Sequence, residues 1–287
     1  PVAFFTRDPE TGLQVWSGEH GYPGDGNYLD FHKKHFPGGH RYWKVTSSDA
    51  DLADKLLYEP ENIDARIREN ASHFKNLVRN ICLSEGMKGN KPPIVCAPFD
   101  TELFGHWWFE GPQWLYQVLK EVSLDPEIES STMGEYYDEW PPMEVVSLPE
   151  GSWGKGGFHW IWLNDLTRWT WKHVYEAEQL MQEASRKFGD RNDEPVRSLL
   201  KLLARELVLL ESSDWQFLIS TWAARDYAEM RFSNHYSDFQ KVLDLLNKAA
   251  SGEQLTVEEE ELVKDISDRD KLFEHIEPKW WAKVENE

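Results

Sequence analysis

The sequence predicts an α/β fold in residues 1–163 and an all-α helical domain in residues 164–287. In the first part, short apolar runs at residues 2–5, 94–97 and 145–148 are bounded by turn-forming or charged residues, a pattern typical of buried strands. Residues 128–132 are a further strand candidate. Between these runs, residues 61–83 and 112–122 carry apolar side chains at the three- and four-residue spacing of helices. From residue 164 onward only the helical spacing continues. About four strands are too few to close a barrel, so we expect a sheet with an open edge.

The first part also contains loops and one α/β repeat. Residues 14–17 are expected to be briefly extended, and the glycine-rich residues 18–26 form a loop that can approach a ligand closely. The helix at 61–83 is followed by Gly86 and by the run at 94–97, and a helix, loop and buried strand make one α/β repeat. A further short helix is predicted at 133–139.

The sequence of residues 164–287 predicts a succession of helices. Asn164 or Asp165 can cap the first of them, which runs to about Phe188. The remaining helices are predicted at residues 196–210, 214–232, 236–249 and 256–266. The glutamates at 258–261 are most simply a solvated face.

Composition narrows the classes of partner. The net charge of −20 argues against binding to nucleic acid or to anionic membranes, because both would be repelled. The charge does not disfavour binding to a neutral polysaccharide. Cys82 and Cys96 form no disulfide framework, which favours free buried thiols in a reducing, cytoplasmic compartment. No run approaches the roughly 20 apolar residues of a membrane span. The chain starts inside an apolar run and without methionine, so we expect it to be part of something longer.

The stretch at residues 94–111 combines acids and aromatics at the end of a predicted strand. Asp100 and Glu102 follow the apolar run, and then come His106 and three aromatic residues. Parallel α/β folds place their chemistry at the carboxyl ends of strands. Carboxylates can transfer protons at a sugar oxygen, and flat rings can stack on its C–H faces. The alternative is a solvated strand end with core aromatics.

Four segments, in order, carry a family resemblance. CAPFDTELFGHWWFEGP (96–112) resembles the fourth signature region of glycoside hydrolase family 57, and ESSDWQFLI (211–219) resembles the fifth. VWSGEHGYPGD (15–25) and GSWGKGGFHWIW (151–162) are similar to segments of the α-1,4-glucan branching enzymes of that family. The resemblance implies the C-terminal half of such an enzyme, with later strands of an incomplete (β/α)7-type barrel and then the helical domain. It implies an α-glucan substrate (amylose, glycogen or starch) and no metal or organic cofactor.

The resemblance makes Asp100 the catalytic acid/base. The family's nucleophile is a glutamate in an earlier region that has no match in these residues, so a companion N-terminal half is the implied partner. Glu102 is a conceivable partner from this chain, but its side chain would diverge from that of Asp100, and we expect it to orient neighbours or bind a hydroxyl. His106 contacts the substrate or is a structural histidine.

The resemblance also implies a glucan groove. Trp16, Trp153 and Trp162 match tryptophans that line this groove in branching enzymes, with core packing as the alternative reading. Asp214 matches the aspartate of the fifth region and could instead cap a helix. We expect Trp153, Trp162 and Asp214 to converge on the mouth that contains Asp100. The other functions left open are a 4-α-glucanotransferase or amylase of the same family, and a glucan-binding module that is inactive by itself.

Overall fold

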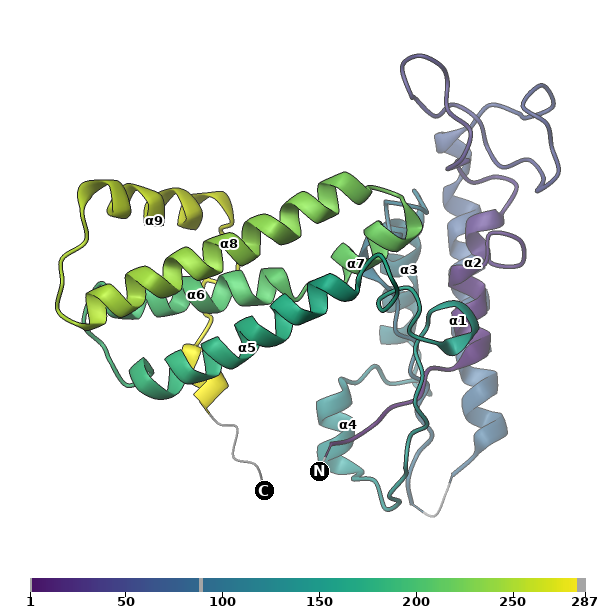
Figure 1. Ribbon diagram of the computed structural model, residues 1–287. Coiled ribbons are helices and arrows are strands. Elements are labelled where there is room, and N and C mark those ends of the chain that lie inside the picture. Colours follow the sequence, from purple (N-terminus) through teal and green to yellow (C-terminus); the bar gives the residue numbers. More distant parts are fainter. Residues whose placement is uncertain (1, 88–89, 283–287) are drawn as a thin grey trace. The chain divides into compact units, whose positions relative to one another are not determined.

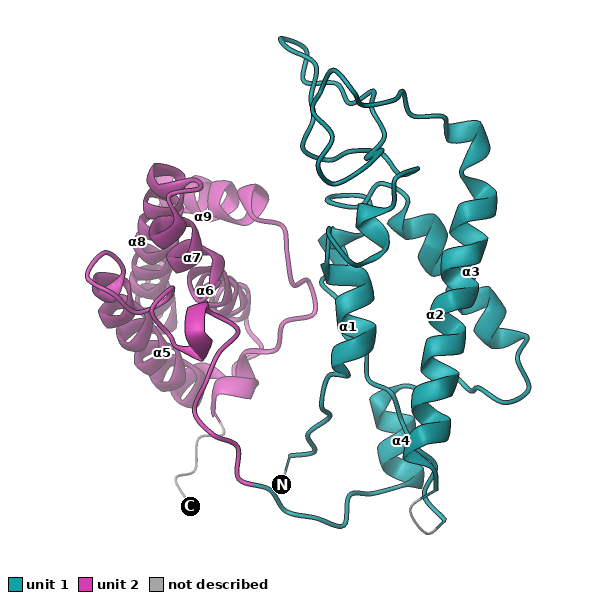
Figure 2. Cartoon of the chain, turned by 90° about the vertical axis from the view of Figure 1, so that its right-hand side faces the viewer, with its two compact units in different colours: residues 1–146 teal, residues 147–287 magenta. Residues whose placement is uncertain are grey.

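The chain folds into two compact units. The computed structural model describes residues 2–87 and 90–282, and the chain divides between Val146 and Ser147 (Figures 1 and 2). The sequence predicts a division after residue 163, whereas the segment 147–163 belongs to the second unit. Each unit has a hydrophobic core of its own.

Unit 1 is built on helices that the local sequence specifies. They are α1 (Pro9–Trp16), α2 (Asp64–Glu85), α3 (Gly111–Ser123) and α4 (Met133–Glu139), joined by loops and short 3-10 turns. Asp8 caps α1 by accepting a hydrogen bond from the backbone N–H of Thr11 at 2.7 Å. Thr132 and Glu135 cap α4 reciprocally in a capping box. The helices predicted at 61–83, 112–122 and 133–139 are therefore confirmed within a few residues.

The predicted strands are absent from the described part of unit 1. Residues 14–16 lie in α1, so the extended piece predicted at 14–17 is wrong. Only isolated bridges occur, such as a parallel bridge between Arg7 and Cys96. Two of the apolar runs leave side chains outside the core, since Val2 is 97% exposed and Val145 is 102% exposed. In the run 94–97, Ala97 packs against the core of unit 1, but the described residues pair with this run only at a single bridge. The barrel segment thus stays a prediction.

An aromatic core holds unit 1 together. The rings of Trp108 and Trp114 lie 5.1 Å apart, and Tyr22 stacks on Trp108 at 6.1 Å. Phe74 brings α2 against α3 through an edge-on contact of 5.0 Å with Trp114. The indole N–H groups of Trp108 and Trp114 are buried and have no partner in the described residues, so these two rings serve packing.

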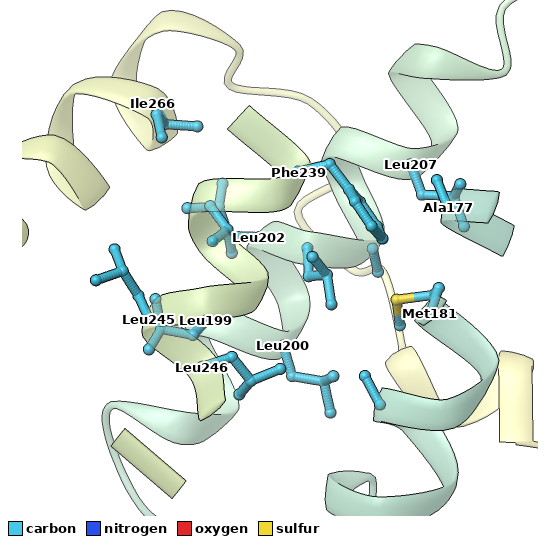
Figure 3. Close-up of a cluster of buried hydrophobic side chains, with 14 of the residues drawn as sticks. Ala177, Met181, Leu199, Leu200, Leu202, Leu207, Phe239, Leu245, Leu246 and Ile266 are labelled. Atoms are coloured by element: carbon cyan, nitrogen blue, oxygen red, sulfur yellow. The ribbon is translucent and has the colours of Figure 1, made fainter. Parts of the chain in front are cut away.

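Unit 2 is helical, as predicted. Its elements are η4 (Lys155–Gly157), α5 (Arg168–Phe188), α6 (Val196–Leu210), α7 (Asp214–Thr221), α8 (Arg225–Ala250), α9 (Val257–Arg269) and η5 (Pro278–Ala282). Helices α5, α6 and α8 lie side by side (Figures 1 and 2). Leucines of α6 enter the core between them, among them Leu199 and Leu207, both fully buried (Figure 3).

One helix boundary in unit 2 was predicted at the wrong place. The sequence predicts a helix break between residues 232 and 236, but α8 runs unbroken from Arg225 to Ala250. The break lies at Trp222, whose backbone adopts the left-handed conformation with φ 59°. No glycine, asparagine or proline stands at this position, so none of the usual helix stop signals marks it.

No helix in the described ranges is both long and apolar enough to cross a membrane. Cys82 and Cys96 are both free, and both are partly exposed, which corrects the expectation of buried thiols. The segment of Cys96 bridges to Arg7, and the backbone N–H of Asp8 donates to the carbonyl of Cys96 at 2.9 Å.

Candidate functional site

Asp100 stands at the point where an extended segment turns into η3 (Thr101–Leu103). Leu103 is 2% exposed and fixes this turn to the core, and its carbonyl accepts the backbone N–H of Trp108 at 3.0 Å. The Asp100 side chain is exposed and makes no hydrogen bond with any described residue. An anchored backbone therefore presents a free carboxylate.

Glu102 and His106 lie on the same turn, and both are exposed. The backbone N–H of His106 donates to the carbonyl of Glu102 at 2.8 Å. The His106 ring packs edge-on against Phe31 at 5.3 Å, which fixes its orientation without burying it. The Glu102 carboxylate, like that of Asp100, has no partner in the described part of the chain.

The loop that follows Trp16 comes against the Asp100 segment. Trp16 ends α1 and is 37% exposed. A Cβ atom on Gly18 would lie 3.5 Å from the Trp107 ring, so the two segments meet there in van der Waals contact. Tyr22, further along the loop, stacks on Trp108. Two of the four segments that carry the family resemblance are thus joined within unit 1.

Glu110 is an acid of the same motif that sequence reasoning did not single out. It is 1% exposed, and its Oε1 accepts the backbone N–H of Leu29 at 2.9 Å. Burial raises the pKa of the Glu110 carboxyl, and the hydrogen bond from Leu29 offsets only part of this rise. Glu110 connects the loop around residue 29 to the turn after Asp100. Its position directly after three aromatic residues was the available signal of burial.

The raised pKa of Glu110 gives a pH dependence of stability. Between the ordinary pKa of a glutamate and the raised value, the unfolded chain releases its proton while the folded protein retains it. The free energy of unfolding therefore falls as pH rises through this window. Glu110→Gln stays neutral and can still accept the N–H of Leu29, so it should remove this part of the slope. In urea unfolding from about pH 4 to 8, the free energy of unfolding of the variant should increase relative to that of the wild type as pH rises. A difference between the two proteins that is constant with pH would contradict a raised pKa at Glu110.

In unit 2, the tryptophan segment meets helix α7. The Trp153 ring lies 4.9 Å from the Trp162 ring and 5.7 Å from that of Phe217 on α7. Trp153 is 76% exposed, whereas Trp162 is half-buried. The carbonyl of Trp162 accepts the Nε1–H of Trp171 at 2.8 Å, which ties the segment to α5. The other two segments of the resemblance are thus joined within unit 2.

Gly154 makes the approach of Trp153 and Trp162 possible. A Cβ atom there would lie 2.8 Å from the carbonyl oxygen of Phe158 and 3.1 Å from the Trp162 ring. A larger residue would therefore push the loop away from Trp162.

Asp214 is the first residue of α7, and its side chain is exposed. The N-cap position belongs to Ser213, and neither side chain makes a capping hydrogen bond, so Asp214 is not the N-cap considered from the sequence. Next to it, Trp215 donates its Nε1–H to the carbonyl of Leu209 at 2.8 Å and thereby fixes the corner between α6 and α7. Asp214, Trp153 and Trp162 belong to unit 2 and Asp100 to unit 1, so their convergence stays a prediction.

Within residues 2–87 and 90–282, one group of side chains has the spacing of metal ligands: Glu206, His235 and Asp270. A cation already occupies this group. Nη2 of Arg231 lies 2.9 Å from Oδ1 of Asp270 and 3.0 Å from Nε2 of His235. A second positive charge at this place would be repelled, so the cluster is better described as a buried network of ion pairs and hydrogen bonds.

Comparison with known proteins points to one family. Residues 173–281 match the family model described as 1,4-alpha-glucan branching enzyme, C-terminal. The chain is 41% identical over 276 residues to a 1,4-alpha-glucan branching enzyme of Thermococcus kodakarensis, covering 96% of this chain and 40% of the relative. This chain therefore spans well under two thirds of that relative's length.

Solved structures agree in fold. The GH57-type branching enzyme of the archaeon Pyrococcus horikoshii superposes with a TM-score of 0.79 at 41% identity, over 98% of this chain and 52% of that one. The α-amylase AmyC of Thermotoga maritima superposes with a TM-score of 0.70 at 28% identity, over 98% of this chain and 55% of that one. Both superpositions cover about half of the longer protein.

Proposed function

We propose that this chain, which is similar over nearly its whole length to glycoside hydrolase family 57 branching enzymes and spans about half of their length, is the C-terminal half of an α-1,4-glucan branching enzyme. The intact enzyme cuts an α-1,4 linkage and rejoins the released piece through an α-1,6 bond. The observation that carries this proposal is the match over nearly the whole chain to branching enzymes, joined to an unpaired carboxylate at Asp100.

Asp100 is the general acid/base of this proposal. In a retaining transfer, one carboxyl group attacks the anomeric carbon, and the other protonates the leaving oxygen and then deprotonates the acceptor hydroxyl. Asp100 suits the second role because its carboxylate is exposed, free of protein partners and carried by a turn anchored through Leu103. Glu102 and His106, exposed on the same turn, are proposed to contact sugar hydroxyls.

The nucleophile is proposed to be a glutamate of the N-terminal half. The two carboxyl groups of a retaining enzyme lie about 5–5.5 Å apart, so this half must fit closely against unit 1. Unit 1 offers a hollow of about 610 Å³ beside the Arg7–Cys96 bridge. Phe4 and Met143 line it and are 58% and 88% exposed. Strands of the missing half would cover these side chains and complete the proposed barrel.

The glucan is proposed to stack on Trp16, Trp153 and Trp162. An indole ring covers the C–H face of a pyranose and leaves its hydroxyls free to hydrogen-bond. Trp16 and Trp153 keep enough exposed surface for this, and the edge-on contact with Trp162 holds the ring of Trp153 in place. Asp214, with its carboxylate unpaired, is proposed to bind a hydroxyl of the same chain.

Two other functions stay open, and the products formed from α-glucan distinguish them from branching. The similarity to an α-amylase favours hydrolysis or 4-α-glucan transfer as the second candidate. The partial coverage of the relatives favours a glucan-binding module without activity as the third.

This chain by itself is expected to bind α-glucan weakly and to convert none of it, whereas the chain combined with its N-terminal half should branch amylose. The measurement is the loss of the iodine complex together with the formation of α-1,6 linkages. Reducing ends without new branches would indicate an amylase. Branching by the chain alone would overturn the two-half proposal and make Asp100 and Glu102 a self-sufficient pair.

A further inference from the structure

We propose that Trp222, at the corner between α7 and α8, is an additional stacking platform for the α-glucan chain. This inference rests on the proposed function, because it extends the aromatic surface that begins at Trp153 and Trp162. Trp222 is 66% exposed, and its backbone is held at φ 59° and ψ 17°. Bulky side chains rarely adopt this left-handed conformation. A tryptophan that is held in this conformation and stays exposed indicates that its ring has a function, such as binding a ligand.

A charged side chain supports one face of the Trp222 ring. The guanidinium carbon of Arg225 lies over the ring, 4.7 Å from its centre. Arg225 is in turn held by Glu229, whose Oε1 accepts its Nε–H at 2.8 Å. Glutamate, arginine and indole thus form a stack that fixes the ring and leaves most of its surface exposed to solvent.

Hydrogen bonds connect the Trp222 corner to the tryptophan segment. Oγ of Ser220, two residues before Trp222, donates to the carbonyl of Ile161 at 2.5 Å. Nδ2 of Asn164 donates to the same Oγ at 2.8 Å. Trp160 and Trp162 flank Ile161, so the end of α7 and this segment are held as one surface. Phe217, which contacts Trp153, lies on α7, the helix that ends directly before Trp222.

The surroundings of Trp222 suit a sugar better than an apolar protein partner. Arg225 and Glu229 are charged, and the neighbouring Thr221 and Asp226 are exposed and polar. Tryptophan anchors at protein interfaces sit within apolar, water-excluding surroundings. A pyranose instead presents a flat C–H face to the ring and a rim of hydroxyls to the polar groups around it.

The experiment measures the affinity of this chain for maltoheptaose by calorimetry and for amylose by electrophoresis through amylose-containing gels. Trp222→Asn removes the ring, and asparagine tolerates the left-handed backbone. We expect its affinity to fall about three- to tenfold, the range of one aromatic stacking contact. Trp222→Phe keeps a flat ring and should restore most of the affinity.

Matched variants separate the possible outcomes. Trp280→Asn alters a tryptophan of unit 2 with the same exposed fraction, 66%, and should leave the affinity unchanged. If Trp153→Asn weakens binding and Trp222→Asn does not, the inference is wrong and the proposed function stands. If Trp222→Asn instead lowers the thermal midpoint or changes the oligomeric mass, Trp222 is a structural contact and the inference is overturned. If the unaltered chain binds no α-glucan, the proposed function fails, and the inference fails with it.

Discussion

Asp100→Asn is expected to lower branching by the reconstituted enzyme by about 10²–10⁴-fold, the range typical of a lost general acid/base. An amide cannot protonate the leaving oxygen, nor can it take the proton from the acceptor hydroxyl. Glucan binding should change little, because the exposed rings of Trp16 and Trp153 remain in place. The measurement is α-1,6 linkage formation on amylose, with affinity for maltoheptaose measured in parallel.

Glu102→Gln is the matched control for this prediction. It removes an exposed carboxylate two residues away on the same turn, and it should cost less than Asp100→Asn because Glu102 is proposed only to contact the substrate. Equal losses in the two variants would show that the pair works as a unit. A fully active Asp100→Asn enzyme would remove Asp100 from the mechanism.

The helices could be predicted from the sequence because each one carries its own apolar stripe. Leu199, Leu203 and Leu207 repeat every four residues, and all three are fully buried in unit 2. Such a stripe specifies a helix whatever lies around it. The apolar run at 94–97 is different, because a strand needs neighbours. Among the residues that the structure describes, it bridges only to Arg7, and Ile94 is 38% exposed.

The motifs located the candidate residues but not their surroundings. The sequence identified Asp100, Trp153 and Asp214, and the structure shows all three side chains exposed. The sequence could not show that Glu110 is buried in unit 1, since its burial depends on contacts with the distant residue Leu29. The helix break at Trp222 was also missed, because no turn-forming residue announces it.

A buried polar network holds the helical unit at its centre. Glu206 on α6 and His235 on α8 are 0% and 1% exposed, and Nδ1 of His235 lies 2.8 Å from Oε2 of Glu206. Nε2 of His235 faces Arg231, a donor, so this nitrogen accepts and Nδ1 carries the proton that is donated to Glu206. Burial raises the pKa of Asp270, but hydrogen bonds from Arg231 and Arg269 outweigh it and hold this pKa below its ordinary value.

His235→Leu is expected to reduce the free energy of unfolding by about 3–5 kcal/mol, the usual cost of leaving a buried charge, here the Glu206 carboxylate, without its partner. Glu206 would then have no donor for either oxygen, since its Oε1 already lacks a partner in the described residues. Urea unfolding followed by circular dichroism measures the loss.

A double variant and a surface control complete this test. The double variant Glu206→Gln, His235→Leu should recover much of the loss, because a neutral amide costs less to bury than a carboxylate. The control, His275→Leu, alters an exposed histidine of the same unit and should stay within about 0.5 kcal/mol of the wild type. If His235→Leu proves as mild as this control, the contact between α6 and α8 depends on the apolar core alone, and the network contributes nothing to stability.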